Sequence, residues 1–130
     1  MLTSSRDRGA AAVEFALILP ILLLLVIGIL EFGRAYHVQT TLSNAARDGV
    51  RVMALQDSHT AALTMVKSSA ETLPLTDSMI VVTPTTGCTS DVTTPGMASV
   101  TITYPFTPVS GLLPIGNLTL TGKGTMRCFG

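Results

Sequence analysis

Residues 10–30 read AAAVEFALILPILLLLVIGIL, and this stretch decides how the chain folds. Its only ionisable residue is Glu14. Its length is close to the roughly 20 residues that an α-helix needs to cross the hydrocarbon core of a bilayer. Pro20 removes one backbone hydrogen bond and tends to kink a helix, which membrane helices tolerate. The sequence therefore predicts a transmembrane helix over residues 10–30.

The helical pattern continues beyond this apolar run. Small and apolar residues recur at steps of three or four and define one narrow face: Phe32, Ala35, Val38, Leu42, Ala45, Gly49 and Val52. Such a face is typical of an amphipathic helix. We therefore expect one helix from about residue 10 to about residue 55, on the order of 70 Å long at the usual rise per residue.

The rest of the chain reads as a polar, threonine-rich domain. Asp57 or Ser58 offers an N-cap for a second helix over residues 60–73, which Pro74 stops. Segments typical of strands follow at residues 79–83, 98–106 and 118–128, with loops at residues 84–96 and 108–116.

Three features refine the expected sheet. The second strand alternates, with Val100, Ile102, Tyr104 and Phe106 on one side. Pro105 limits that strand to an edge position or ends it. Gly122 or Gly124 is expected to bend the third strand. The fold class is therefore α+β: a long N-terminal helix, a short second helix, and a small three-stranded antiparallel sheet whose apolar face packs on the soluble half of the first helix.

Composition argues against several classes of function. The 130 residues suffice for one small domain and one membrane segment, and the zero net charge without a basic run argues against nucleic-acid binding. The chain has no HExxH, GxSxG or Walker A motif. We expect His37 and His59 to be solvated or packed rather than catalytic. The sequence predicts no enzyme activity, no metal site and no cofactor.

Cys88 and Cys128 both lie in the C-terminal half, outside any CxxC pair or Cys/His cluster. If this half is exported, one disulfide is expected, closing a loop of about 40 residues and contributing roughly 3–4 kcal/mol on the chain-entropy model. The alternative is two free thiols.

The spacing around Glu14 carries a functional signal. Glu14 is the fifth residue after Gly9, Phe15 is the sixth, and a short polar leader with Arg8 precedes them. This order resembles the class III signal of type IV pilins and pseudopilins. The resemblance implies a leader over residues 1–9 that a prepilin peptidase removes between Gly9 and Ala10, with Arg8 in leader recognition. The alternative is a carboxylate merely tolerated at the lipid headgroups.

A closer resemblance extends over residues 8–55. The segments that carry it are Arg8–Leu17, Leu19-Pro20, Gly28–Ala35 and Asn44–Arg51. They resemble the N-terminal half of TadE-like proteins, minor pseudopilins of the tight-adherence (Tad/Flp) pilus. Ala at position 10 suits that group rather than a major pilin. The C-terminal part carries no matching motif, but a small variable domain there is similar to what the family shows.

This resemblance implies a pilin-like fold and a structural role in pilus assembly and surface adherence. Glu14 and Phe15 would act in assembly, with Glu14 pairing with the freed α-amino group of a neighbouring subunit, and the apolar stripe through Leu42 would be the packing face. Expected partners are prepilin peptidase, other pilin and pseudopilin subunits, the inner-membrane assembly platform and membrane lipid. Residues 31–130 would be extracytoplasmic, in the periplasm of a bacterium.

Two other interpretations remain open at this point. Gly33-Arg34-Ala35 is a small-x-small pattern, so an ordinary signal peptidase could cut after Ala35 and release a soluble domain. Against this, the apolar run is longer than the apolar region of about 7–15 residues in a usual signal sequence, and the amphipathic pattern continues across this site. The chain could also be an unprocessed membrane anchor. Arginines flank both ends of the run, so charge alone leaves the topology undecided, and the cysteines and the resemblance favour an N-in orientation.

Overall fold

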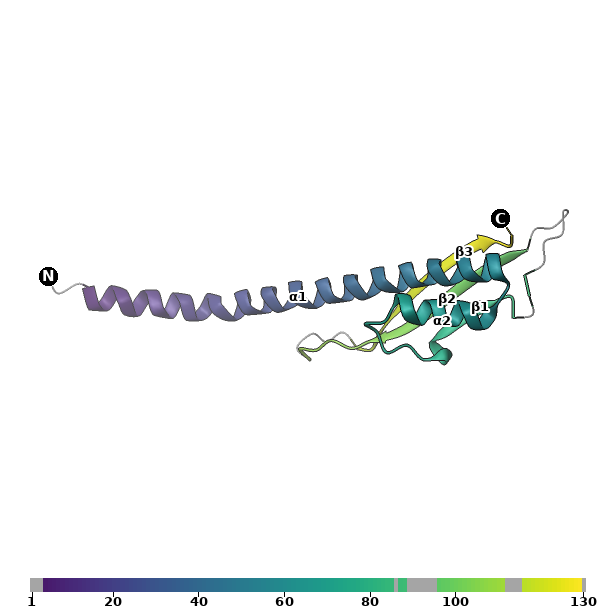
Figure 1. Cartoon of the computed structure of the whole chain (residues 1–130). Helices are drawn as coiled ribbons and strands as arrows, with labels where there is room; N and C mark the ends of the chain where they lie inside the picture. The colour runs from purple at the N-terminus through teal and green to yellow at the C-terminus, as the bar shows by residue number, and fades with distance from the viewer. Residues whose placement is uncertain (1–3, 86, 89–95, 112–115, 130) are drawn as a thin grey trace. The chain divides into compact units, whose positions relative to one another are not determined.

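The structure is a computed structural model that describes residues 4–85, 87–88, 96–111 and 116–129. Its elements are the helices α1 (Ser4–Gln56) and α2 (His59–Ser69), the short 3₁₀ helix η1 (Asp77–Met79), and the strands β1 (Ile80–Thr83), β2 (Met97–Phe106) and β3 (Leu118–Arg127) (Figure 1). This confirms the predicted α+β class. Parts of both predicted loops, and the first three residues of the predicted leader, lie outside the described residues.

The chain divides into two compact units. Among the described residues, the first unit holds residues 4–34 with 108–111. The second unit holds residues 35–107 with 116–129, apart from the gaps between the described ranges. We describe each unit by itself.

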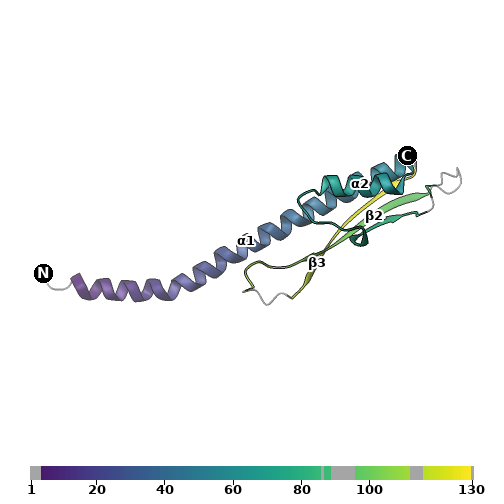
Figure 2. The same cartoon turned by 60° about the horizontal axis from the view of Figure 1, so that its bottom comes forward.

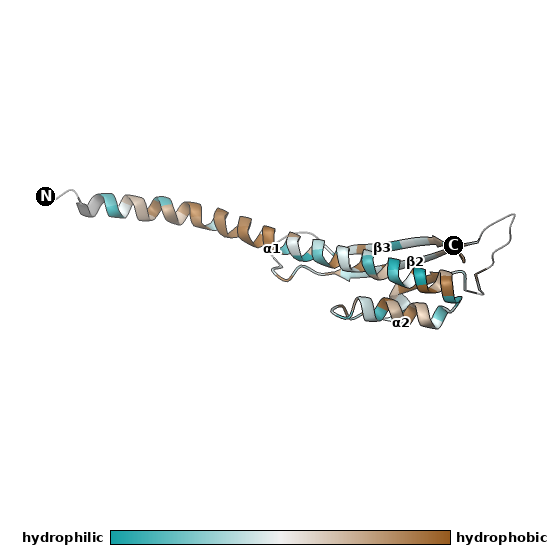
Figure 3. Ribbon diagram, turned by 45° about the horizontal axis from the view of Figure 1, so that its top comes forward, coloured by the Kyte–Doolittle hydropathy of each residue, from teal (hydrophilic) through white to brown (hydrophobic). Residues whose placement is uncertain are grey.

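In the first unit, α1 begins at Ser4, earlier than the predicted start near residue 10. Asp7 lies in the first turn, where its charge favours the helix dipole, and neither Gly9 nor Pro20 ends the helix. Side chains from Asp7 to Val26 are all exposed, and the helix is apolar over most of this length (Figure 3). Because no protein surface in the described chain covers these apolar side chains, this part of α1 fits a single-pass membrane anchor.

The second unit is a three-stranded antiparallel sheet in the order β1-β2-β3, with two helical segments on one of its faces (Figure 2). Ala98, Val100, Ile102 and Phe106 of β2 are buried, as the alternation predicts, while Tyr104 is half-buried. They share one core with buried side chains of α1 and α2, among them Leu42, Ala46, Val50, Met53, Ala62 and Val66. The prediction that the sheet packs on the soluble half of α1 is confirmed.

Pro105 was expected at an edge or at a strand end, but β2 is the central strand and continues to Phe106. The reason is the length of β1, which pairs only with Ser99 to Ile102 of β2. At Pro105 only β3 pairs with β2, through Thr119. A proline is tolerated there because one side of β2 is locally an edge.

No β-bulge accompanies the bend that was expected at Gly122 or Gly124. The pairing of β2 with β3 runs in constant register from Met97↔Arg127 to Phe106↔Leu118, without an extra residue in either strand. Both glycines are buried instead against α1. A Cβ atom at Gly122 would lie 2.5 Å from the carbonyl oxygen of Leu42, and one at Gly124 would lie 2.7 Å from that of Ala46. The glycines therefore let β3 approach the backbone of the helix.

The buried face of α1 is wider than predicted. Ala46, Val50 and Ala54 are buried beside the stripe residues Leu42 and Ala45, but Phe32 at the start of the predicted stripe is 75% exposed. The helix buries a wider face because α2 packs on it as well as the sheet. A Cβ atom at Gly49 would meet a methyl group of Val66 in α2. The part of the stripe around Leu42 is thus occupied by the chain's own core, which corrects its assignment as a packing face for other subunits.

Helix α2 begins as predicted and ends earlier than the expected residue 73. Ser58 is its N-cap, and its hydroxyl accepts a hydrogen bond from the Ala61 amide at 3.3 Å. The last helical residue is Ser69, whose hydroxyl donates to Asp48 of α1 at 2.8 Å. The helix stops short because the backbone leaves helical geometry at Ala70 (φ −113°, ψ 38°), after which the Leu73 amide donates to the Ala70 carbonyl at 2.9 Å in a turn.

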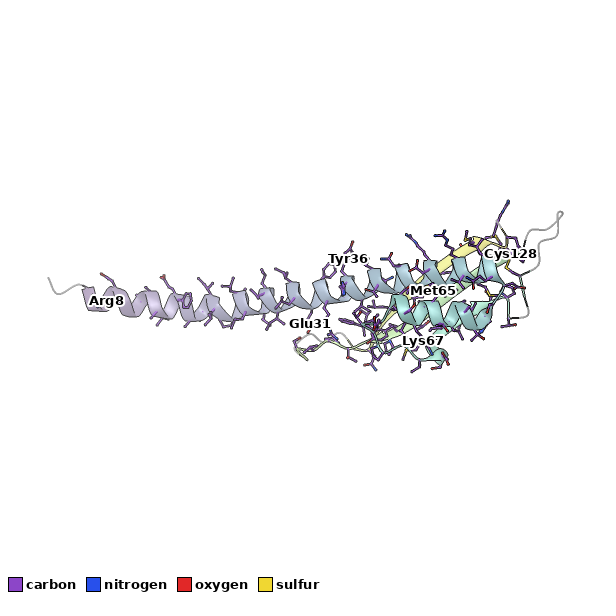
Figure 4. The ribbon with its side chains drawn as sticks, viewed as in Figure 1. Arg8, Glu31, Tyr36, Met65, Lys67 and Cys128 are labelled. Carbon is purple, nitrogen blue, oxygen red and sulfur yellow. A yellow bond between two sulfur atoms is a disulfide. The ribbon has the colours of Figure 1, made fainter. Side chains whose placement is uncertain are left out.

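The end of β3 is tied to the end of α1. Cys88 and Cys128 form a disulfide with their Cα atoms 5.6 Å apart, and both are buried (Figure 4). The amide of Phe129 donates to the Ala54 carbonyl at 2.8 Å, and the Asp57 carboxylate accepts from the Cys88 amide. The bond from Phe129 satisfies the carbonyl of Ala54, one of the backbone groups that a helix end otherwise leaves without a partner.

We expect Gly122→Ala to lower the free energy of unfolding by about 1–3 kcal/mol, because the new methyl group overlaps the backbone of α1, which cannot move aside as a side chain would. Chemical denaturation of the full chain in detergent, followed by circular dichroism, measures this. Gly116→Ala is the matched control, since a Cβ atom there meets nothing within 4 Å. Equal midpoints for the two variants would contradict the close helix–strand contact.

Candidate functional site

Arg8, Gly9 and Ala10 lie in the first turns of α1 and are all exposed. The predicted cleavage position between Gly9 and Ala10 is therefore on the surface, within regular helix. A Cβ atom added at Gly9 would meet nothing within 4 Å. A larger residue at position 9 thus leaves the fold intact, which makes this glycine suitable for a test of processing.

Glu14 lies on the exposed apolar part of α1, next to Phe15, which is 61% exposed. In the described part of the chain Glu14 makes no hydrogen bond and no ion pair. A carboxylate in such a place is costly in lipid unless it gains a cationic partner. Its position can therefore serve an interaction with another molecule, but the structure holds no such partner.

Glu31 is a second carboxylate, directly after the apolar run, and it is buried at 9% exposure. Its Oε1 atom accepts a hydrogen bond from the Ser110 amide at 2.8 Å. Its Oε2 atom lies 3.7 Å from Nη1 of Arg34, one helical turn later. The side chain is on α1 in the first unit (Figure 4), and we call this arrangement the Glu31 clip. The clip joins the β2–β3 connection to the helix.

The sequence pattern did not identify Glu31 as a site residue. Its place at the end of the apolar run was visible, but its partner is a backbone amide far along the chain, which no side-chain pattern reveals. Leu30 and Phe32 on either side of it are 68% and 75% exposed. The burial of Glu31 between two exposed apolar residues therefore comes from the segment around Ser110, not from the helix itself.

A shallow hollow of about 310 Å³ adjoins the clip, lined by Ile27, Leu30, Glu31, Arg34, Val109 and Ser110. The hydroxyl of Ser110 and the Oε2 atom of Glu31 are both buried without a hydrogen-bond partner. The lining is largely apolar, and its polar members are Glu31, Arg34 and Ser110.

The remaining predicted residues add no reactive centre. His37 is exposed and His59 is half-buried. Among the described residues, no three His, Cys, Asp or Glu side chains come together as metal ligands would. The cysteines are the predicted pair that the structure brings into contact.

Residues 9–51 match the family model of TadE-like proteins, which confirms the resemblance seen in the sequence. The match spans Gly9, Glu14 and Glu31 and ends within α1. No curated protein and no solved structure matches the chain.

Replacing Glu31 by Ala removes the acceptor of the Ser110 amide, and we expect that amide to exchange its hydrogen at least about tenfold faster. The estimate follows from the roughly 1.5–3 kcal/mol of a hydrogen bond to a charged group. Hydrogen exchange of the full chain in detergent, read by NMR, measures it. Glu31→Gln keeps an acceptor oxygen and should retain part of the protection, while exposed Glu71→Ala should change nothing at Ser110. Unchanged exchange in Glu31→Ala would show that the clip does not exist in solution.

Proposed function

We propose that this chain, whose residues 9–51 are TadE-like, is a minor pseudopilin of a Tad/Flp pilus in a bacterial inner membrane. The match of residues 9–51 to the TadE-like family model supports an association with a Tad pilus and a structural rather than an enzymatic role. The observation that carries the proposal is the exposed apolar part of α1 with one carboxylate, Glu14, at the fifth position after Gly9. The proposed role of the protein is in pilus assembly and surface adherence.

The first step of this function is processing. A prepilin peptidase removes residues 1–9, with Arg8 in recognition and the bond between Gly9 and Ala10 as the site of cleavage. Cleavage creates a new α-amino group at Ala10. That group is a cation four residues before Glu14, at the same end of the apolar run.

The second step is assembly with other pilin and pseudopilin subunits at the inner-membrane assembly platform. Glu14 pairs with the α-amino group of a neighbouring subunit, and Phe15 packs beside the pair. In a low-dielectric place an ion pair with good geometry offsets the cost of holding a lone carboxylate in lipid. This supplies the partner that Glu14 lacks within the described chain.

The third element is the location of the folded domain. Residues 31–130 lie in the periplasm, and the chain crosses the membrane once. The buried disulfide between Cys88 and Cys128 supports a periplasmic location of this domain, because disulfides persist in oxidising compartments. The proposal includes incorporation of the subunit into the pilus, which this topology permits.

A second candidate is an unprocessed single-pass anchor that holds a structural or binding module. One observation favours it: α1 runs without interruption from Ser4 through Gly9 to Gln56. In this case the residues before Ala10 remain as part of the helix, and Glu14 has no assembly role.

Gly9→Leu is expected to block cleavage, because the peptidase acts after a small residue and the structure leaves room for the larger one. The wild-type chain recovered from membranes should begin at Ala10, and the variant should keep its leader. N-terminal sequencing and intact mass measure both.

Gly33→Leu is the matched control, since its Cβ atom also meets nothing within 4 Å. It should leave a start at Ala10 unchanged. A start at Tyr36 that is lost in Gly33→Leu would instead identify an ordinary signal peptidase. A wild-type chain with its leader intact would support the unprocessed anchor and end the processing proposal.

Glu14→Gln should abolish pilus assembly, because the uncharged amide cannot form the ion pair with a neighbouring subunit. Pili are counted by electron microscopy, and membrane levels of the protein are checked by immunoblot. Glu71→Gln, an exposed carboxylate in the second unit, should leave the pili unaffected. Normal piliation in Glu14→Gln would contradict the assembly role even if processing occurs.

A further inference from the structure

The first unit contains a short segment that is not part of α1. Residues 108–111 come from the connection between β2 and β3, and the Glu31 clip holds them against the helix where the apolar run ends. Val109 in this segment is 76% exposed, the highest exposure among the large apolar side chains of the described residues. An exposed apolar side chain, Val109, therefore lies beside α1 at the point where the apolar part of the helix ends.

The apolar surface around this segment is continuous. Val109 lines one hollow together with Ile27 and Leu30, and Leu30 is itself 68% exposed. Leu30 belongs to the apolar part of α1 that fits a membrane anchor. The surface that lipid covers on the helix therefore extends onto Val109 without a polar break.

The clip explains how a polar backbone can lie at this level. A carboxylate near lipid needs a partner, and an amide N–H near lipid needs an acceptor. Glu31 and the Ser110 amide supply each other at 2.8 Å, with Arg34 beside the second carboxylate oxygen. The Ser110 amide and the Oε1 atom of Glu31 are thereby paired, while the side chain of Val109 next to them is exposed.

We propose that residues 108–111 form a second membrane contact, in which Val109 enters the boundary between lipid headgroups and acyl chains beside α1. The occupant of this surface is lipid. Phe32, one residue after Glu31, is also 75% exposed, so the exposed apolar side chains of the helix reach the level of the clip. The inference rests on α1 being a membrane anchor, but it does not depend on cleavage at Gly9 or on pilus assembly.

The chain contains no tryptophan, so Val109→Trp introduces a single fluorophore at the proposed contact. The full chain is reconstituted into phosphatidylcholine vesicles whose acyl chains carry bromine, which quenches tryptophan on contact. We expect blue-shifted emission and clear quenching relative to unbrominated vesicles.

Two further tryptophan variants serve as the unquenched and the fully quenched controls. Val81→Trp replaces a valine of β1 that is also exposed, at 56%, and should be neither shifted nor quenched. Ile21→Trp, at an exposed position within the apolar part of α1, should be quenched most. Quenching at position 21 without quenching at position 109 overturns the second contact and leaves the anchor intact. Absence of quenching at both positions overturns the anchor as well.

The clip provides an independent test in the Val109→Trp background. Glu31→Ala should reduce quenching at position 109, because the segment loses its bond to the helix, while Glu31→Gln should retain more of it. Emission that is blue-shifted but unquenched by bromine, and that depends on the ratio of protein to lipid, would show that a second copy of the chain covers Val109. That outcome overturns the assignment to lipid.

Discussion

The fold of the second unit depends on close approach between β3 and the backbone of α1. A sheet normally keeps its distance from a helix because side chains lie between them, but Gly122 and Gly124 remove those side chains at two alternate positions of one strand. The small residues Ala45 and Ala46 of α1 are fully buried in the same core. The consequence is that β3 and the backbone of α1 lie close together at these positions, while larger buried side chains of α2, β1 and β2 fill the rest of the core.

Much of this architecture was predictable because it rests on local patterns. The helix over the apolar run, an N-cap at Asp57 or Ser58 and the alternation of β2 each depend on one segment of sequence. The structure has the helix, has Ser58 as the N-cap and buries the alternating residues of β2. The predictions failed where the role of a residue depends on a contact with a residue that is distant in the sequence. The glycines of β3 were expected to bend the strand because their contact with α1 is not visible in sequence. The Ser110 amide was missed as a partner of Glu31 for the same reason.

The two carboxylates of the first unit differ in what surrounds them. Glu31 finds an amide and an arginine within its own chain, so its charge is accounted for when the subunit folds. Glu14 has neither an amide nor an arginine as a partner among the described residues, so its carboxylate is available to bind another molecule. The same residue type thus fixes the chain's own structure at one end of the apolar run, while at the other end it is available for the proposed ion pair between subunits.

The disulfide also imposes an order in time. Cys88 precedes β2, while Cys128 follows β3, so the bond cannot close until both strands have reached the compartment that oxidises them. Under the proposed topology, a subunit that has only partly crossed the membrane would still be reduced and open to proteases. Closure of the bond would then mark a subunit whose sheet is complete, before it competes for a place in a growing filament.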